Sequence, residues 1–213
     1  VAIVTLMKEH GNLEVRLDAA AHLLNRDHPD VLSVLLREWS VYQSSKESFD
    51  DPFETMADLL ACQGSDRAVQ ALIRGWEARG PGQRLKIVEK IGECMVQKPR
   101  THSFDSHAVP RKPEDAALTR AIALLVTALE DTTTDYGISG GGPELTYGEA
   151  SIGEFALRAL HELAPARFAF TPKAGRRQRH AERIAAANLW RKEHSLPLLP
   201  TPPPPGPKLP AAD

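Results

Sequence analysis

The residues best suited to metal chemistry lie in one short segment of the chain. His102, Asp105 and His107 place two imidazoles and a carboxylate within six residues, and Cys94 precedes them. Zinc accepts these ligand types. Zinc signatures such as Cys-x-x-Cys and His-Glu-x-x-His are absent from the sequence, however. We therefore interpret 102–107 as a solvated loop, with a metal site as the alternative, and expect no metal and no cofactor.

A glycine-rich segment is the second place where chemistry could be sought. Gly140–Gly142 and Pro143 are not followed by Lys-Ser or Lys-Thr, which a phosphate-binding loop would need. Asp131, Asp135 and Glu144 do not follow the spacing of a calcium-binding EF-hand. No recognised nucleophile motif is present either. We interpret the segment as a connector and expect the chain not to be an enzyme.

The two cysteines, Cys62 and Cys94, are too few for a disulfide framework. Each is predicted to lie near the end of the first helix of a helix pair. The simplest interpretation is that both are small buried hydrophobic side chains.

A cluster of cations marks the beginning of the last predicted helix. It consists of Lys173, Arg176, Arg177, Arg179 and Arg183. A helix N-terminus carries partial positive charge, so these cations do not stabilise the helix on which they lie. We predict that the cluster binds an acidic protein partner or a neighbouring subunit. The alternative is ion pairing with the acidic body of the same chain.

Composition limits the class of protein that can position these residues. The 213 residues are 42% hydrophobic and 25% charged, which is enough for a sizeable core. Aromatic residues make up only 6%, and no alternating strand pattern is visible, so an all-β fold is not expected. No apolar run approaches the roughly 18 residues of a membrane span. We expect a cytoplasmic protein.

Net charge differs between the two parts of the chain. The total is −2, but the residues before Ala164 include 17 basic and 25 acidic side chains, whereas those from Ala164 onward include 9 and 3. The acidic body argues against broad contact with nucleic acid, which requires many phosphate contacts. A nucleic acid is therefore not the expected partner.

Helical periodicity dominates the sequence. Apolar residues recur at intervals of three and four in eight stretches, with Asn12 as a candidate N-cap and one helix predicted to begin at Ser65. A ninth helical stretch opens the chain. A capping box, in which two residues three apart cap a helix reciprocally, is predicted at Thr146 and Glu149. Because Val1 is not an initiator residue, we expect a fragment or a processed chain.

An internal repeat relates two of these helices. The segment 31–39 aligns with 68–76 at an offset of 37 residues, matching Trp39 with Trp76. Such a period indicates paired helices that bury their apolar faces by stacking on neighbours. We predict an all-α solenoid of about four helix pairs, with both tryptophans buried in the core.

The segment Leu13-Glu14-Val15-Arg16-Leu17-Asp18-Ala19-Ala20 resembles the core of bacterial HEAT-like repeats of the type also seen in phycobilin lyases. The segment 152–163, followed by Phe168-Ala-Phe170 and a helix ending in Trp190, is similar to the last helix pair of many such proteins. The resemblance implies an α-solenoid in which Arg16 pairs with carboxylates between repeats.

The function implied by this resemblance is a non-enzymatic protein-interaction or scaffold module. Two alternatives remain from the same resemblance: a nucleic-acid-binding protein similar to HEAT-like DNA glycosylases, and a lyase or chaperone that holds a tetrapyrrole.

Long connections and a proline-rich end depart from a minimal array. Loops are predicted at 43–51, 98–113, 131–146 and 164–178. The prolines of the end segment favour an extended polyproline conformation. We expect the solenoid to span residues 1–195 and an extended tail to span 196–213.

Overall fold

The computed structural model describes residues 2–42, 52–95, 108–135, 137, 140–141 and 145–201. In these ranges the fold is all-α, as predicted, apart from one short turn of 3-10 helix and one antiparallel pairing of two-residue strands, β1 with β2. The elements are α1 (Ala2–Glu9), α2 (Leu13–Leu24), α3 (Val31–Val41), α4 (Pro52–Gln63), α5 (Asp66–Ile73), η1 (Trp76–Ala78), α6 (Pro81–Met95), α7 (Asp115–Ala128), β1 (Gly140–Gly141), β2 (Thr146–Tyr147), α8 (Ile152–Leu163) and α9 (Arg176–Glu193).

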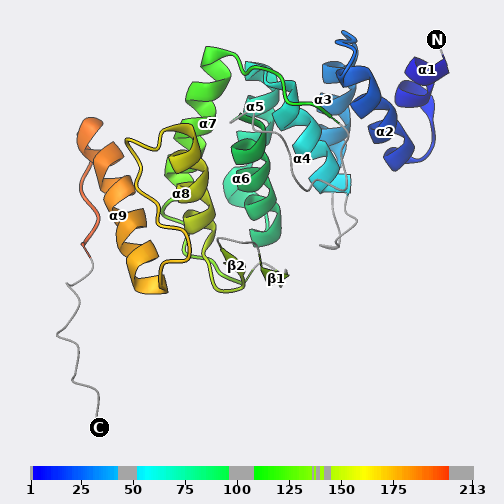
Figure 1. Cartoon of the computed structure of the whole chain (residues 1–213). Helices are drawn as coiled ribbons and strands as arrows, with labels where there is room; N and C mark the ends of the chain where they lie inside the picture. Colours follow the sequence, from blue (N-terminus) through cyan, green and yellow to red (C-terminus); the bar gives the residue numbers. More distant parts are fainter. Residues whose placement is uncertain are drawn as a thin grey trace.

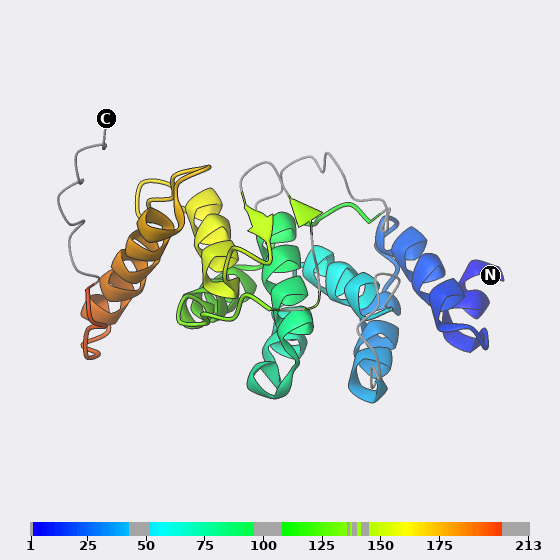
Figure 2. The same cartoon turned by 90° about the horizontal axis from the view of Figure 1, so that it is seen from below.

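The helices form two parallel rows along the molecule (Figures 1 and 2). Helices α2, α4, α6 and α8 contact one another in succession, and α3, α5, α7 and α9 do the same in the second row. Each helix of the first row also packs on the next helix in the chain. Helix α1 covers α2 at one end, and α9 lies at the other. Each of these contacts joins helices that are adjacent or next but one in the chain.

The N-cap predicted at Asn12 is confirmed, and the helix predicted to begin at Ser65 has that residue as its N-cap. The Asn12 side chain accepts a hydrogen bond from the Glu14 backbone N–H at 2.8 Å. The Ser65 hydroxyl accepts one from the Ala68 N–H at 3.3 Å. Both caps satisfy a backbone donor that the first helical turn leaves without an intrahelical partner.

The capping box predicted at Thr146 and Glu149 is wrong. Thr146 belongs to β2, and the next turn contains Gly148 at φ 85°. The box lies instead at Ser151 and Glu154, whose side chains each accept a hydrogen bond from the backbone N–H of the other residue. Thr146 pairs with Gly141 as a strand residue and therefore cannot begin a helix, so α8 begins directly after its N-cap, Ser151.

The predicted burial of the two repeat-related tryptophans is confirmed, with 7% of Trp39 and 8% of Trp76 exposed. Their local structures differ. Trp39 lies within α3, whereas Trp76 belongs to η1, because Gly75 takes the left-handed conformation after α5 ends. The Trp39 indole N–H donates to the Ala71 carbonyl of α5 at 2.9 Å. The Trp39 side chain thus connects α3 to α5, the helices that carry the two aligned segments.

Helix α8 approaches its neighbours closely where it meets glycine. A Cβ added to Gly92 of α6 would lie 2.8 Å from the Ala159 Cβ, and one added to Gly153 would lie 2.6 Å from the Leu129 carbonyl oxygen. Neither distance is sterically tolerable without movement. Because glycine has no side chain, Gly92 and Gly153 allow α8 to pack closely on α6 and α7.

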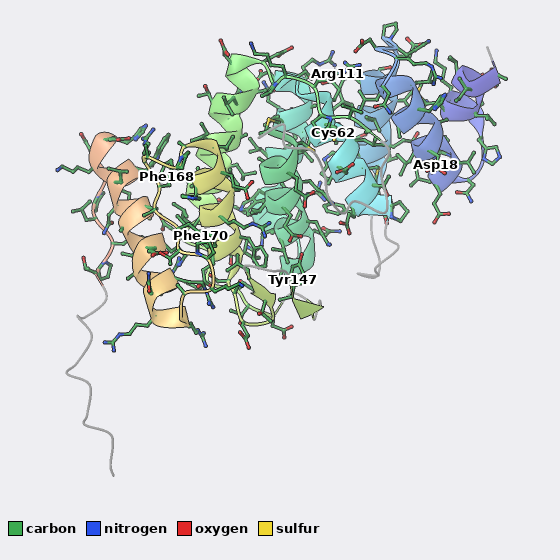
Figure 3. All side chains as sticks on the ribbon, in the orientation of Figure 1. Asp18, Cys62, Arg111, Tyr147, Phe168 and Phe170 are labelled. Carbon is green, nitrogen blue, oxygen red and sulfur yellow. The ribbon has the colours of Figure 1, made fainter. Side chains whose placement is uncertain are left out.

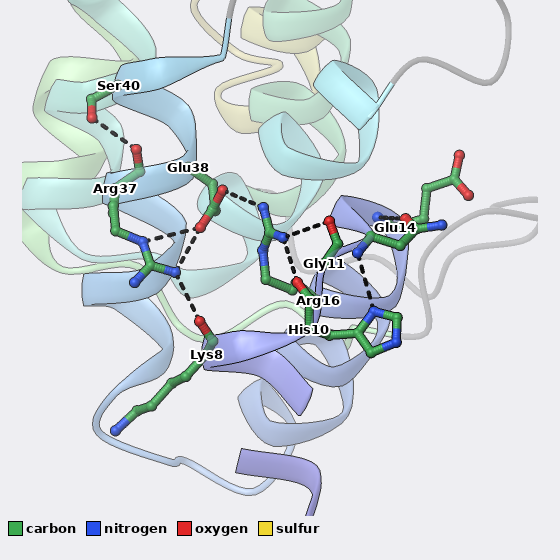
Figure 4. A network of polar contacts seen from close by, with 9 residues as sticks. Lys8, His10, Gly11, Glu14, Arg16, Arg37, Glu38 and Ser40 are labelled. Carbon is green, nitrogen blue, oxygen red and sulfur yellow. Dashed lines mark hydrogen bonds and ion pairs between the residues drawn. The ribbon is translucent and has the colours of Figure 1, made fainter. Parts of the chain in front are cut away.

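A polar network joins the first helices (Figure 4). Glu38 accepts hydrogen bonds from Arg16 at 2.8 Å and from Arg37 at 2.7 Å, and Arg16 also donates to the His10 carbonyl. Arg16 therefore pairs with a carboxylate of the adjoining helix α3. Burial alone would raise the pKa of Glu38, but the hydrogen bonds from the two arginines outweigh it and hold that pKa below its usual value.

Stability should therefore depend on pH through Glu38. A carboxylate with a lowered pKa stabilises the fold above its unfolded-state pKa of about 4.5, and this contribution is lost as the pH falls through the folded-state value. We expect Glu38→Gln to lower the free energy of unfolding by roughly 2 kcal/mol at neutral pH. Urea denaturation should show that the difference from wild type shrinks in acid. Glu14→Gln, at an exposed position, is the control; equal stability of Glu38→Gln and wild type at neutral pH would contradict the argument.

The beginning of the predicted tail packs against α9. Asn188 exchanges hydrogen bonds with the Leu199 backbone at 2.7 and 3.0 Å, and Arg191 donates to the Pro197 carbonyl. Leu199 is half-buried against the core. The beginning of the segment predicted as a tail therefore contacts α9, and residues 202–213 lie outside the described ranges.

None of the described helices combines the length and the apolar character that a membrane span requires.

Candidate anion-binding pocket

The predicted basic cluster does not form one surface. Arg183 is only 3% exposed, and its guanidinium donates to the Leu129 carbonyl. The Arg179 side chain is also largely buried and donates to the Glu154 carboxylate at 2.9 Å. Arg179 therefore pairs with a carboxylate of the same chain, which is the alternative interpretation of the cluster, and Arg183 is buried against a backbone carbonyl.

The physical reason lies in a neighbouring helix. Leu129 is the C-cap of α7, and the end of a helix carries partial negative charge that favours a cation. Arg183 lies on α9 but donates to the end of α7, so its charge interacts favourably with the dipole of α7. Burial lowers the pKa of Arg183, while the nearby carboxylates of Glu154, Glu130 and Asp131 oppose the shift.

The other members of the cluster remain at the surface. Lys173, Arg176 and Arg177 are exposed, and Lys173 takes a left-handed backbone conformation in the turn before α9. Their role in binding an acidic partner stays a prediction.

A pocket of about 430 Å³ lies between α3 and α5. Three arginines dominate its polar lining: Arg67 on α5, Arg74 at the end of α5, and Arg79 directly after η1. The rest of the wall consists of Leu36, Trp39, Ser40, Gln70 and Ala71. None of the described residues that line the pocket is acidic.

Arg79 is held by aromatic rings. Its guanidinium carbon lies 4.5 Å from the centre of the Trp39 ring and 5.1 Å from that of Phe53. Among the described residues, its buried Nε has no hydrogen-bond partner, and burial lowers the pKa of the side chain. The rings contact the guanidinium through their faces, and its Nε–H is left without an acceptor in the described ranges.

The three pocket arginines differ from most others in their electrostatic partners. Among the described residues, no carboxylate forms an ion pair with Arg67, Arg74 or Arg79. Glu77 lies between two of them in sequence but is exposed and outside the lining. Carboxylate partners are found for Arg16, Arg37, Arg84, Arg111, Arg120, Arg167, Arg179 and Arg191.

Such a lining suits an anion. A guanidinium presents several donors in a planar fork that matches the two oxygens of a carboxylate. Trp39 and Leu36 add apolar surface for the body of an anionic side chain. Sequence reasoning did not identify this site. The available signal was the excess of arginine over the segment 67–79.

A second polar cluster surrounds Tyr147 (labelled in Figure 3). The Tyr147 hydroxyl donates to the Glu89 carboxylate at 2.5 Å, and its ring stacks on Phe155. Burial raises the pKa of Glu89, an effect that Lys86 partly opposes. Lys86 also bridges to Glu54 on α4 at 3.0 Å. These contacts join α4, α6 and β2, so we interpret the cluster as structural.

Most of the remaining candidates for metal binding lie outside the part of the chain that the structure describes. His102, Asp105 and His107 lie outside the described residues, as does Glu144. Asp131 forms an ion pair with Arg84 and accepts a hydrogen bond from the Thr133 N–H. The arrangement around Asp131 thus connects the end of α7 to α6.

The two cysteines are buried, as predicted, but they are also in contact with each other. Asp58 joins them in a group of three potential ligands.

The comparisons made with protein-family models, with curated proteins and with solved structures find no match to this chain.

Proposed function

We propose that this protein is a non-enzymatic protein-interaction module, an α-solenoid of HEAT-like helix pairs that binds an acidic segment of a partner protein. The observation that carries the proposal is the pocket between α3 and α5, where Arg67, Arg74 and Arg79 line about 430 Å³ without an ion-paired carboxylate in the described ranges. The two rows of successively packed helices support the solenoid architecture.

The size and charge of the site favour a peptide. A pocket of this volume accommodates a few side chains, whereas a nucleic-acid duplex requires an extended basic surface. The chain has a net charge of −2, so the pocket is a local cationic feature on an acidic protein. An acidic peptide fits both properties, because it brings concentrated negative charge to a small area.

The test is selection from a library of random short peptides, followed by affinity measurement with fluorescein-labelled versions of those that bind. We expect the selected peptides to be enriched in Asp and Glu and to lose affinity with added salt. Arg67→Glu combined with Arg74→Glu should weaken binding by at least about tenfold, because two attractive interactions become repulsive. Both side chains are exposed, so the melting temperature should change little.

A matched control is available in the basic cluster. Arg176→Glu combined with Arg177→Glu makes the same change of charge on the exposed beginning of α9. Affinity for the selected peptides should stay within about twofold of wild type. If this control abolishes binding and the pocket variant does not, the acidic partner binds the basic cluster. Selection of peptides without acidic residues, or tight binding only to labelled duplex DNA or to a tetrapyrrole, would contradict the proposal.

A further inference from the structure

Cys62 and Cys94 meet in the core although 32 positions separate them. Cys62 lies in the last turn of α4, and Cys94 lies in the last turn of α6. Their sulfur atoms are 3.0 Å apart, and the residues are 0% and 1% exposed. Figure 3 shows Cys62 near Arg111, whose backbone N–H donates to the Cys62 carbonyl at 2.9 Å. The Cys62 backbone is thus held in place.

Asp58 completes the surroundings of the two thiols. It lies one turn before Cys62 on the same helix, and its carboxylate is 4.0 Å from the Cys62 sulfur. The Asp58 main-chain carbonyl is 3.9 Å from the Cys94 sulfur. The three residues offer ligand atoms within 4.8 Å of one another, so a metal ion and a covalent cross-link are both chemically conceivable at this place.

The distance between the sulfurs favours the cross-link. Two thiolates bound to one tetrahedral zinc ion lie about 3.8 Å apart, because each Zn–S bond is about 2.3 Å long. The observed 3.0 Å is shorter than this separation, and closing it to the disulfide bond of about 2.05 Å requires a small movement of the side chains. A metal would instead require the sulfurs to move apart.

The charges point to the same conclusion. Asp58 already interacts electrostatically with the buried Lys90 ammonium, so its carboxylate is not a spare ligand for a metal ion, and two thiolates would still have to be desolvated. A disulfide is neutral. It also removes the need for the buried thiols to find hydrogen-bond partners.

We propose that Cys62 and Cys94 are a reversible oxidation site, at which a disulfide cross-links α4 to α6. The oxidant is a small disulfide of the glutathione class. The thiolate of one cysteine attacks the oxidant, forms a mixed disulfide and releases one small thiol. The second cysteine then attacks the protein sulfur of that mixed disulfide and releases the other small thiol. The two protons of the cysteines end on the two thiols released.

The cross-link joins consecutive helices of the first row. It closes the chain between Cys62 and Cys94 into a loop, which reduces the conformational freedom of the unfolded state. Oxidation should therefore stabilise the fold and slow the separation of α4 from α6. This inference does not depend on the pocket ligand.

The experiment refolds the full-length chain from denaturant in a buffer of oxidised and reduced glutathione, so that burial does not protect the thiols. Mass spectrometry of unreduced peptides should find 62 linked to 94, with the loss of two hydrogen atoms and no accessible thiol. The melting temperature should rise by roughly 5–15 °C relative to the reduced protein and return after reduction. The Cys62→Ala, Cys94→Ala double variant should show no response to glutathione.

The other outcomes would overturn the proposal. Two free thiols after oxidative refolding, or glutathione remaining attached to one cysteine, would show that the pair does not close. A parallel arm refolds the reduced chain with zinc chloride and counts the bound metal. Uptake of one zinc ion per chain that is abolished in the double variant, without formation of the disulfide in the glutathione arm, would identify a metal site instead.

Discussion

Replacing Glu154 with alanine is expected to lower the free energy of unfolding by roughly 3–5 kcal/mol, because the substitution breaks a buried ion pair. Glu154 is 4% exposed, and one of its carboxylate oxygens accepts a hydrogen bond from Arg179 at 2.9 Å. The other oxygen accepts the Ser151 backbone N–H at 2.6 Å and so caps α8. The variant therefore leaves the Arg179 guanidinium without its carboxylate and the Ser151 N–H at the beginning of α8 without its acceptor. Urea denaturation followed by circular dichroism measures the loss.

Glu149 provides the matched control for this prediction. It is the acidic residue of the capping box that the sequence pattern suggested, and it is exposed in the structure. Glu149→Ala should change the free energy of unfolding by less than about 0.5 kcal/mol. Similar losses for the two variants would mean that Glu154 has no special role at the beginning of α8.

Replacing Trp39 with alanine is expected to lower the free energy of unfolding by roughly 3–5 kcal/mol, through loss of buried surface and creation of a cavity. The ring lies 4.9 Å from that of Phe53, supports the Arg79 guanidinium and donates to the Ala71 carbonyl. We expect Trp76→Ala to cost a similar amount, because Trp76 is equally buried. Denaturation curves recorded by far-ultraviolet circular dichroism allow the comparison without tryptophan fluorescence.

A smaller substitution separates the two contributions of Trp39. Trp39→Phe retains an aromatic ring but removes the indole N–H, so it should cost less than Trp39→Ala while still losing about 1 kcal/mol for the hydrogen bond to Ala71. Val41→Ala, at a position that is 67% exposed in the same helix, should be nearly neutral. A Trp39→Ala variant that melts within a degree of wild type would favour a role in recognition over a role in the core.

The positions of the helices could be predicted from the sequence alone. Their apolar periodicity is a local property, since residues three and four apart share a face wherever the helix lies. The caps at Asn12 and Ser65 also involve only the following turn. Burial of Trp39 and Trp76 followed from the apolar stripes that they end.

Only the tertiary structure decided which of several local possibilities were used. Two similar capping boxes stand five residues apart, and strand pairing of Thr146 with Gly141 excludes the first. The orientation of Arg183 depends on the end of α7, which lies 54 positions earlier at Leu129. No pattern within α9 contains this information.

The pocket and the cysteine pair have the same origin in long-range contact. Arg79 meets the Trp39 ring because α3 packs on α5, and Cys62 meets Cys94 because α4 packs on α6. A sequence shows which side chains could bind an anion or form a disulfide. Whether two of them come within reach depends on the stacking of helices, which is set by the complementary shapes of buried surfaces distant in the chain.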